Sequence, residues 1–209
     1  MKQRIGRLVV ITDTHIQSRF THEELAELAC AGGADVIQLR DKKMSDDEFN
    51  QVALRVRDIC RRYQKMLIIN DHVDVARAVE ADGVHVGQDD MRVQEARVVL
   101  GSRAIIGTSA GNAIEAHAGH RAGADYIGVG HVFATSSKTK PGAPIGLAVL
   151  ADACRNVSRP VIAIGGITEA NLAEVMEAGA WGVAVISAVC ATRDPRAATA
   201  GLRAALSNV

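Results

Sequence analysis

Eight short apolar segments recur along the chain at similar intervals. Each is rich in Val and Ile and is bounded by Gly, Pro or polar residues, which is typical of strands buried on both faces of a parallel sheet. Between most of them lie Ala- and Leu-rich stretches with the spacing of amphipathic helices. The pattern predicts strands at residues 8–12, 36–40, 66–70, 83–87, 104–109, 126–130, 160–166 and 182–187.

The intervening stretches carry signals for helix starts and helix ends. In THEELAELACAGG, Thr21 can cap a helix and Glu24 follows three residues later, as a capping box requires. Gly32 and Gly33 then predict the end of that helix. The same order of helix end, glycine turn and buried strand returns as a weak internal repeat at residues 31–39, 80–87, 121–130 and 177–186.

Strands that alternate with helices predict βαβ units with right-handed crossovers. Eight such units in 209 residues predict one domain, residues 1–209, folded as an α/β protein of the (β/α)8 TIM-barrel type. The main alternative is an open doubly wound sheet. That fold would place a phosphate site after the first strand, but the residues there, ITDTHIQ, contain no GxGxxG.

Charge and composition narrow the expected partners. Lys plus Arg and Asp plus Glu number 24 each, so the chain lacks the cationic excess on which nucleic-acid binding depends. No apolar stretch approaches the length of a membrane helix or of a signal-peptide core, so we expect a cytoplasmic protein that contacts no membrane. The four cysteines form no CxxC pair, which favours reduced thiols.

Polar and charged residues follow the early strands, where a barrel of this type carries its functional groups. Alternation places Gln38, Arg40 and Lys42 on one side of an extended segment, which would suit a polyanion. Asp71 and Asp90 come after the third and fourth strands, where two carboxylates can hold Mg²⁺ together with substrate phosphates. Taken singly, these residues also fit a solvated charge run or a helix cap.

The later strand ends add small hydroxyls, a lysine and glycines. Ser109 could donate to a phosphate, and residues 135–138 supply three hydroxyls and a lysine that could close over an anionic substrate. Gly166 and Ser187 end the predicted seventh and eighth strands, and the loops after these strands commonly bind phosphate in such barrels. We therefore expect two anion sites, with the long irregular stretch 131–146 between them.

The histidines form no evident metal-binding set. His85 lies inside the fourth strand, where we expect a hydrogen-bonded interior residue, and His131 lies at the barrel mouth. Cys190, just past the eighth strand, has no base placed to activate it, and we expect an inert thiol.

Seven motifs occur in order along the chain: QLRDK, IINDH, VHVGQDD, GTSA, GHVFATSSK, AIGGIT and AVISA. They resemble the motifs of the thiamine phosphate synthase family, and the resemblance spans the chain from VVITD to the final helix. It implies a transferase that joins 4-amino-2-methyl-5-hydroxymethylpyrimidine diphosphate to thiazole phosphate, or its carboxy form, and releases pyrophosphate. In that family the reaction is dissociative: pyrophosphate leaves first, and the thiazole nitrogen attacks the pyrimidine methyl cation.

The resemblance also implies a role for each matching position. Asp71 and Asp90 would bind the cofactor Mg²⁺. The catalytic residues would be Arg40, Lys42, Lys138 and Ser109. The pyrimidine diphosphate would be held by Gln38, Leu39, Arg40, Asp41, Lys42, Asn70, Ser109 and Lys138. The thiazole side would be lined by Thr135, Ser136 and Ser137, and the thiazole phosphate would be held by Gly166, Ile186 and Ser187. The family also suggests a homo-oligomer.

Two alternatives stay open at this point. The related thiazole tautomerase resembles GHVF-containing sequences, and in such an enzyme His131 could move the proton. That isomerase needs no diphosphate site, whereas Asn70, Asp71 and Asp90 are all present here. The third hypothesis is a non-catalytic or regulatory protein that binds thiamine phosphate. The intact set of anion-binding residues favours the transferase.

Overall fold

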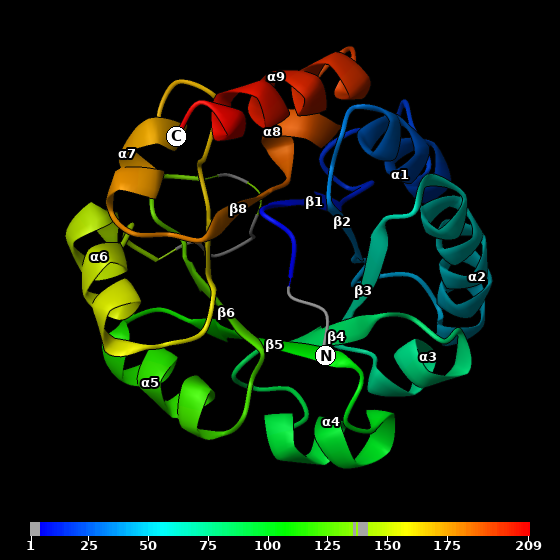
Figure 1. Ribbon diagram of the computed structural model, residues 1–209. Coiled ribbons are helices and arrows are strands. Elements are labelled where there is room, and N and C mark those ends of the chain that lie inside the picture. Colours follow the sequence, from blue (N-terminus) through cyan, green and yellow to red (C-terminus); the bar gives the residue numbers. More distant parts are fainter. Residues whose placement is uncertain (1–4, 136, 138–141) are drawn as a thin grey trace.

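The computed structural model describes residues 5–135, 137 and 142–209. In these ranges eight parallel strands close into one barrel in sequence order, with β8 paired to β1 (Figure 1). The closed barrel confirms the predicted (β/α)8 fold and excludes the open sheet. The strands are β1 Leu8–Thr12, β2 Val36–Leu39, β3 Met66–Asn70, β4 Gly83–Val86, β5 Ile105–Ala110, β6 Tyr126–Gly130, β7 Val161–Ile164 and β8 Gly182–Val185.

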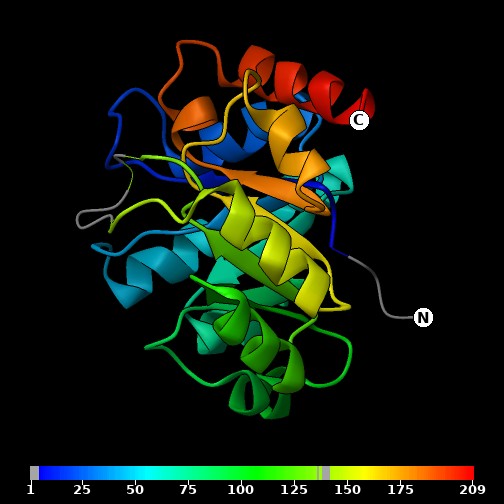
Figure 2. The same ribbon diagram turned by 90° about the vertical axis from the view of Figure 1, so that its left-hand side faces the viewer.

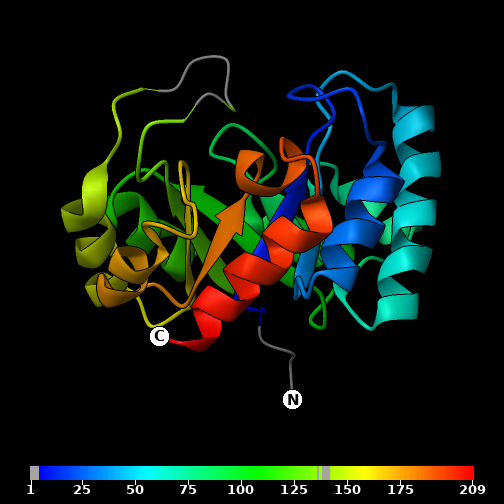
Figure 3. The same cartoon turned by 90° about the horizontal axis from the view of Figure 1, so that it is seen from above.

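Helices surround the barrel, and Figure 2 shows α6 and α7 packed along the outside of the strands. The helices are α1 His22–Ala31, α2 Asp46–Tyr63, α3 Val73–Ala78, α4 Val93–Leu100, α5 Ala113–Arg121, α6 Gly146–Asn156, α7 Leu172–Glu177, α8 Ser187–Cys190 and α9 Pro195–Ser207. In Figure 3 the arrows of β1 and β8 point to the end of the barrel at which the connections to the helices begin. Among the described residues, no helix is both long and apolar enough to cross a membrane.

The predicted capping box at the start of α1 is confirmed. The Glu24 N–H donates to Thr21 Oγ1 at 3.2 Å, and the Thr21 N–H donates to Glu24 Oε2 at 2.8 Å. Gly32 caps the other end, and Gly33 follows with a φ of 98°, a conformation that favours glycine.

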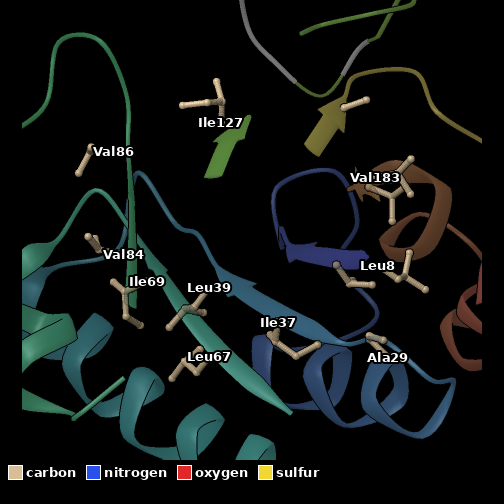
Figure 4. Packing of buried hydrophobic residues seen from close by; sticks show 14 of the residues in the cluster. Leu8, Ala29, Ile37, Leu39, Leu67, Ile69, Val84, Val86, Ile127 and Val183 are labelled. Carbon is tan, nitrogen blue, oxygen red and sulfur yellow. The ribbon is translucent and has the colours of Figure 1, made fainter. Parts of the chain in front are cut away.

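Alternation along each strand divides the core into two parts. One cluster lies between strands and helices, and Figure 4 shows Ile37, Leu39, Leu67 and Ile69 in it. The other fills the barrel interior and includes Val9, Ile11, Val36, Ile68 and Ile162. Neighbouring residues of one strand therefore belong to different clusters, as the pleat of a β-strand requires.

The weak internal repeat has a structural counterpart in three aspartates that precede even-numbered strands. Each accepts a hydrogen bond from the N–H of the first or second residue of the preceding strand and returns its own N–H to the carbonyl of that same residue. The carboxylate bonds are Leu8 N–H to Asp35 at 3.0 Å, Leu67 N–H to Asp82 at 2.8 Å and Ile106 N–H to Asp125 at 2.8 Å. The returning bonds are 3.0, 3.0 and 2.7 Å. These pairs join strands at the amino end of the barrel.

The fourth repeat uses a different residue at the same place. The Trp181 N–H donates to the Val161 carbonyl, as the aspartates do in the other repeats. Its indole N–H donates to the Ile5 carbonyl at 2.9 Å, so Trp181 also joins the amino end of the barrel.

Replacing Asp35 tests the importance of these aspartates. Its Oδ2 accepts the N–H groups of Arg7 and Leu8 and also pairs with Arg203 at 2.9 Å. Asp35→Ala leaves the fully buried Leu8 N–H without this acceptor, so we expect a loss of roughly 1–3 kcal/mol in the free energy of unfolding, measured in urea. The exposed Asp89→Ala variant should change stability by less than about 0.5 kcal/mol. Equal losses in both variants would contradict this role.

Candidate active site at the carboxyl ends of the strands

The barrel interior changes from apolar to polar toward the carboxyl ends of the strands. The Tyr126 phenol lies 3.0 Å from His85 Nδ1, and His85 Nε2 lies 2.9 Å from Ser109 Oγ. Gln38 also hydrogen-bonds to Tyr126, which is fully buried and whose pKa burial raises. A polar chain therefore crosses the interior through β2, β6, β4 and β5. The prediction of a hydrogen-bonded interior role for His85 is confirmed.

Two glycines leave room for these hydrogen-bonded side chains. A Cβ at Gly107 would lie 2.1 Å from Tyr126 Cζ, and a Cβ at Gly128 would lie 3.0 Å from His85 Cε1. Any side chain at Gly107 would displace the tyrosine, since 2.1 Å is far below van der Waals contact. Tyr126 has the interior alternation of Gly128, which could have revealed its place, but sequence reasoning assigned Tyr126 no role.

Charged side chains that follow β2, β3 and β4 meet at the carboxyl end of the barrel. Lys42 Nζ lies 3.4 Å from Asp71 Oδ2, and the Gly87 N–H donates to Asp90 Oδ2 at 2.8 Å. Burial and the neighbouring Asp90 carboxylate raise the pKa of Asp71. Burial opposes ionisation of Asp90 too, but its bonds with Asp71 and Gly87 bring its pKa below the usual value. The structure thus brings Lys42, Asp71 and Asp90 together.

The two carboxylates form a donor set that suits a hard divalent cation. Two like charges in a partly buried place disfavour each other, and a cation between them relieves that cost. In the described parts of the chain, no group of three His, Cys, Asp or Glu residues is arranged to hold a metal. Asp71 and Asp90 would therefore need water or substrate oxygens to complete the coordination of Mg²⁺, which is usual for this ion.

Asp71 occupies an unusual backbone position at the end of β3. Its φ is 64°, in the left-handed region that Asp and Asn tolerate better than most residues. The preceding Asn70 has the same interior alternation as Ile68 and is 9% exposed. Asn70 is paired in register with His85 on β4, so it lies beside the polar chain.

Arg40 lies beside Asp13, a residue that sequence reasoning did not select. Arg40 Nη1 is 3.0 Å from Asp13 Oδ2. Asp13 directly follows β1 and shares the interior alternation of Val9 and Ile11, so its position gave a usable signal.

Two of the residues in QLRDK point away from the barrel mouth. Leu39 is fully buried in the cluster under the helices. Asp41 accepts the N–H groups of Lys43 and Met44, and its carboxylate contacts both His15 and His22. The side chains of Leu39 and Asp41 therefore lie apart from the other predicted diphosphate ligands, because alternation sends every second residue of this segment outward.

A hollow lies at the ends of β7 and β8. It adjoins a second hollow in the barrel interior, since Ile164 and Ala184 line both. Gly165 and Gly166 have φ of 100° and 66°, and a Cβ at Gly166 would lie 2.5 Å from the Ala134 carbonyl oxygen. The predicted thiazole-side residues that line the first hollow are Thr135, Ser137, Gly166, Ile186 and Ser187.

Two predicted residues of the 131–146 segment, Ser136 and Lys138, lie outside the described residues. His131 also lines the first hollow, and its Nε2 lies 2.9 Å from the Gly142 carbonyl oxygen. Cys190 is completely buried, and burial raises its pKa to about 12, in agreement with the predicted inert thiol.

A (β/α)8 barrel with polar residues and adjoining hollows at the carboxyl ends of its strands has the architecture of TIM-barrel enzymes. The family of thiamine monophosphate synthases matches this chain over residues 8–189, and the chain belongs to that family. The predicted family and the transferase class are thereby confirmed.

Individual relatives are similar to this chain over nearly its full length. Thiamine-phosphate synthase of Salinibacter ruber is 50% identical over 208 residues, covering 100% of this chain and 92% of the relative. The enzyme of the same name from Chloroflexus aurantiacus is 50% identical over 201 residues, covering 96% and 93%. The structure of thiamine phosphate pyrophosphorylase from Pyrococcus furiosus superposes with a TM-score of 0.88 at 38% identity, covering 97% and 96%.

Gly107→Ala tests the packing of the interior polar chain. The new Cβ would push against the Tyr126 ring, so we expect a loss of roughly 1–3 kcal/mol in the free energy of unfolding. Gly111→Ala is the matched control, because its nearest neighbour would be Glu115 Oε2 at 3.5 Å, an ordinary contact. Chemical denaturation measures both. Equal stability of Gly107→Ala and Gly111→Ala would contradict the close packing of Tyr126 against Gly107.

Asp41→Asn tests the outward-facing carboxylate. Burial alone would raise the pKa of Asp41, but hydrogen bonds from Lys43, His22 and His15 hold it well below the usual value. A lowered pKa stabilises the fold above the ordinary carboxyl pKa of about 3.9 and loses this effect as the pH falls further. We expect Asp41→Asn to cost roughly 1.5–3 kcal/mol at pH 7 and less below pH of about 4, measured by denaturation across pH. If the free energies of unfolding of the wild type and Asp41→Asn differ by the same amount at every pH, the stabilising role of ionised Asp41 is contradicted.

Proposed function

We propose that this chain joins 4-amino-2-methyl-5-hydroxymethylpyrimidine diphosphate to thiazole phosphate, or to its carboxy form, and releases pyrophosphate with the help of Mg²⁺. The observation that supports this reaction is the meeting of Lys42, Asp71 and Asp90 at one barrel end. Relatives at 50% identity carry the name thiamine-phosphate synthase.

The diphosphate side of the proposed site extends over β2 to β5. Asp71 and Asp90 would hold Mg²⁺, which when bound neutralises charge on the leaving pyrophosphate. Arg40, Lys42 and Lys138 would stabilise the same charge, since preorganised cations are effective where negative charge develops. The remaining contacts to this substrate would come from Gln38, Asn70 and Ser109, with Leu39 and Asp41 contributing through the backbone of their segment rather than their side chains.

The monophosphate side would be the hollow at the ends of β7 and β8. Backbone amides of Gly166, Ile186 and Ser187 would bind the thiazole phosphate, and Thr135, Ser136 and Ser137 would line the thiazole side. The interior hollow adjoins this one at Ile164 and Ala184, so two substrates bound in them would meet there. The proposed order is dissociative: the carbon–oxygen bond to pyrophosphate breaks first, and the thiazole nitrogen attacks the resulting cation. That nitrogen carries no proton, so no general base is required.

The same geometry disfavours the tautomerase hypothesis. An isomerase has no use for a paired carboxylate site beside Lys42, although His131 does line the neighbouring hollow. The hypothesis of a non-catalytic protein that binds thiamine phosphate is also disfavoured. The Asp71 and Asp90 carboxylates repel each other, and the pKa of Asp71 is raised, which is characteristic of functional sites.

The decisive experiment measures pyrophosphate release with both substrates, with and without Mg²⁺. Loss of a residue that only supports a metal ligand typically lowers activity roughly 10–100-fold. Asp71 and Asp90 would be ligands themselves, so we expect Asp71→Asn and Asp90→Asn each to lower kcat/KM at least that much. Asp89→Asn is the matched control, because Asp89 is the exposed neighbour of Asp90, and it should retain normal turnover. Undiminished release in EDTA would contradict the proposal. Isomerisation that is lost in His131→Ala but kept in Asp71→Asn would support the tautomerase instead.

A further inference from the structure

Arg40 has a single polar partner within the described residues, the carboxylate of Asp13. The guanidinium Nη1 and Asp13 Oδ2 are 3.0 Å apart, with side chains 17% and 3% exposed. An arginine has five N–H donors in a rigid planar fork, so one anchored nitrogen restricts the plane of the whole group. Most of its donors remain available to a ligand.

Asp13 is itself held in place by the chain. Its second oxygen, Oδ1, accepts the His15 N–H at 2.8 Å, so both carboxylate oxygens have a partner. It directly follows β1, and its side chain has the interior alternation of that strand. The anchor for Arg40 is therefore fixed to the barrel itself.

A carboxylate at this place needs a reason, because it repels the polyanion that the neighbouring groups would bind. Its negative charge also offsets part of the attraction that Arg40 exerts on a diphosphate. Orientation of the planar fork is a benefit that can outweigh this electrostatic cost, since bidentate recognition of phosphate depends on the plane of the guanidinium.

We propose that Asp13 is a positioning residue, which fixes the Arg40 guanidinium so that its unpaired N–H groups face the diphosphate. The proposal rests on the proposed function for the identity of this ligand. Asp13 touches no reacting atom in this scheme and acts through Arg40 alone.

Asp13→Asn tests the idea with almost no change of volume. The His15 N–H and Arg40 contact different oxygens of Asp13, and asparagine replaces one of these oxygens with an NH2 group, a donor that would face one of the two donors. The probe is inorganic pyrophosphate with Mg²⁺, whose Kd is measured by calorimetry for the wild type, Asp13→Asn, Arg40→Gln and the double variant.

We expect each single variant to weaken pyrophosphate binding roughly tenfold, as for a lost hydrogen bond to a charged group. The double variant should bind no more than about twofold more weakly than Arg40→Gln, because residues that act through one contact are not additive. Asp35→Asn is the matched control: it alters an Asp–Arg pair at the other end of the barrel and should leave the Kd unchanged. In turnover assays, Asp13→Asn should lower kcat/KM for the diphosphate substrate and leave the KM for thiazole phosphate unchanged.

Tighter or unchanged pyrophosphate binding in Asp13→Asn would overturn the proposal, and so would losses that multiply in the double variant. Absence of pyrophosphate binding by the wild type would overturn it as well. If Asp13→Asn does not fold, Arg40→Lys serves instead: it keeps the charge beside Asp13 but lacks the fork, and wild-type affinity there would exclude an orienting role. Coupled pyrophosphate binding without any turnover would reject the proposed reaction while supporting the role of Asp13.

Discussion

Closure of eight parallel strands into a barrel is the constraint on which the rest of this structure depends. Closure forces alternate residues of every strand into one shared interior, where side chains from distant parts of the chain must fit together. Near the amino ends this interior is filled by apolar residues such as Val9 and Ile68. Near the carboxyl ends it becomes polar, with Tyr126, His85 and Ser109 joined by hydrogen bonds. The candidate site is this polar end of the interior, continued by the loops.

Buried charge is handled in two different ways around the barrel mouth. Asp13 and Asp41 are almost fully buried, and each carboxylate is satisfied by hydrogen bonds or an ion pair. Asp71 is different, because its neighbour is another carboxylate and its pKa is raised. A folded protein gains nothing from such a pair by itself, and groups with perturbed pKa values cluster at functional sites. In the proposed site, the same contrast would separate supporting residues from residues that face the substrate.

The two halves of the proposed chemistry correspond to two halves of the barrel. Strands β2 to β4 bring charged groups together, whereas β7 and β8 end in glycines and small residues around a hollow. These differ because a leaving diphosphate requires concentrated positive charge, and a bound monophosphate can be held by backbone amides. The hollows adjoin at Ile164 and Ala184, so in the proposed reaction two anionic substrates would meet there with their phosphates apart.

The sequence by itself determined the barrel, its eight strands, the Thr21 capping box and the place of most candidate residues at strand ends, because each depends on local periodicity or on short motifs. Only the tertiary structure decided that Asp41 faces outward, that Asp13 pairs with Arg40 and that Tyr126 bonds to His85. Alternation predicts the side to which a strand residue points. The identity of its partner depends on which residues of other strands reach the same level of the interior, and that is settled only when the barrel closes.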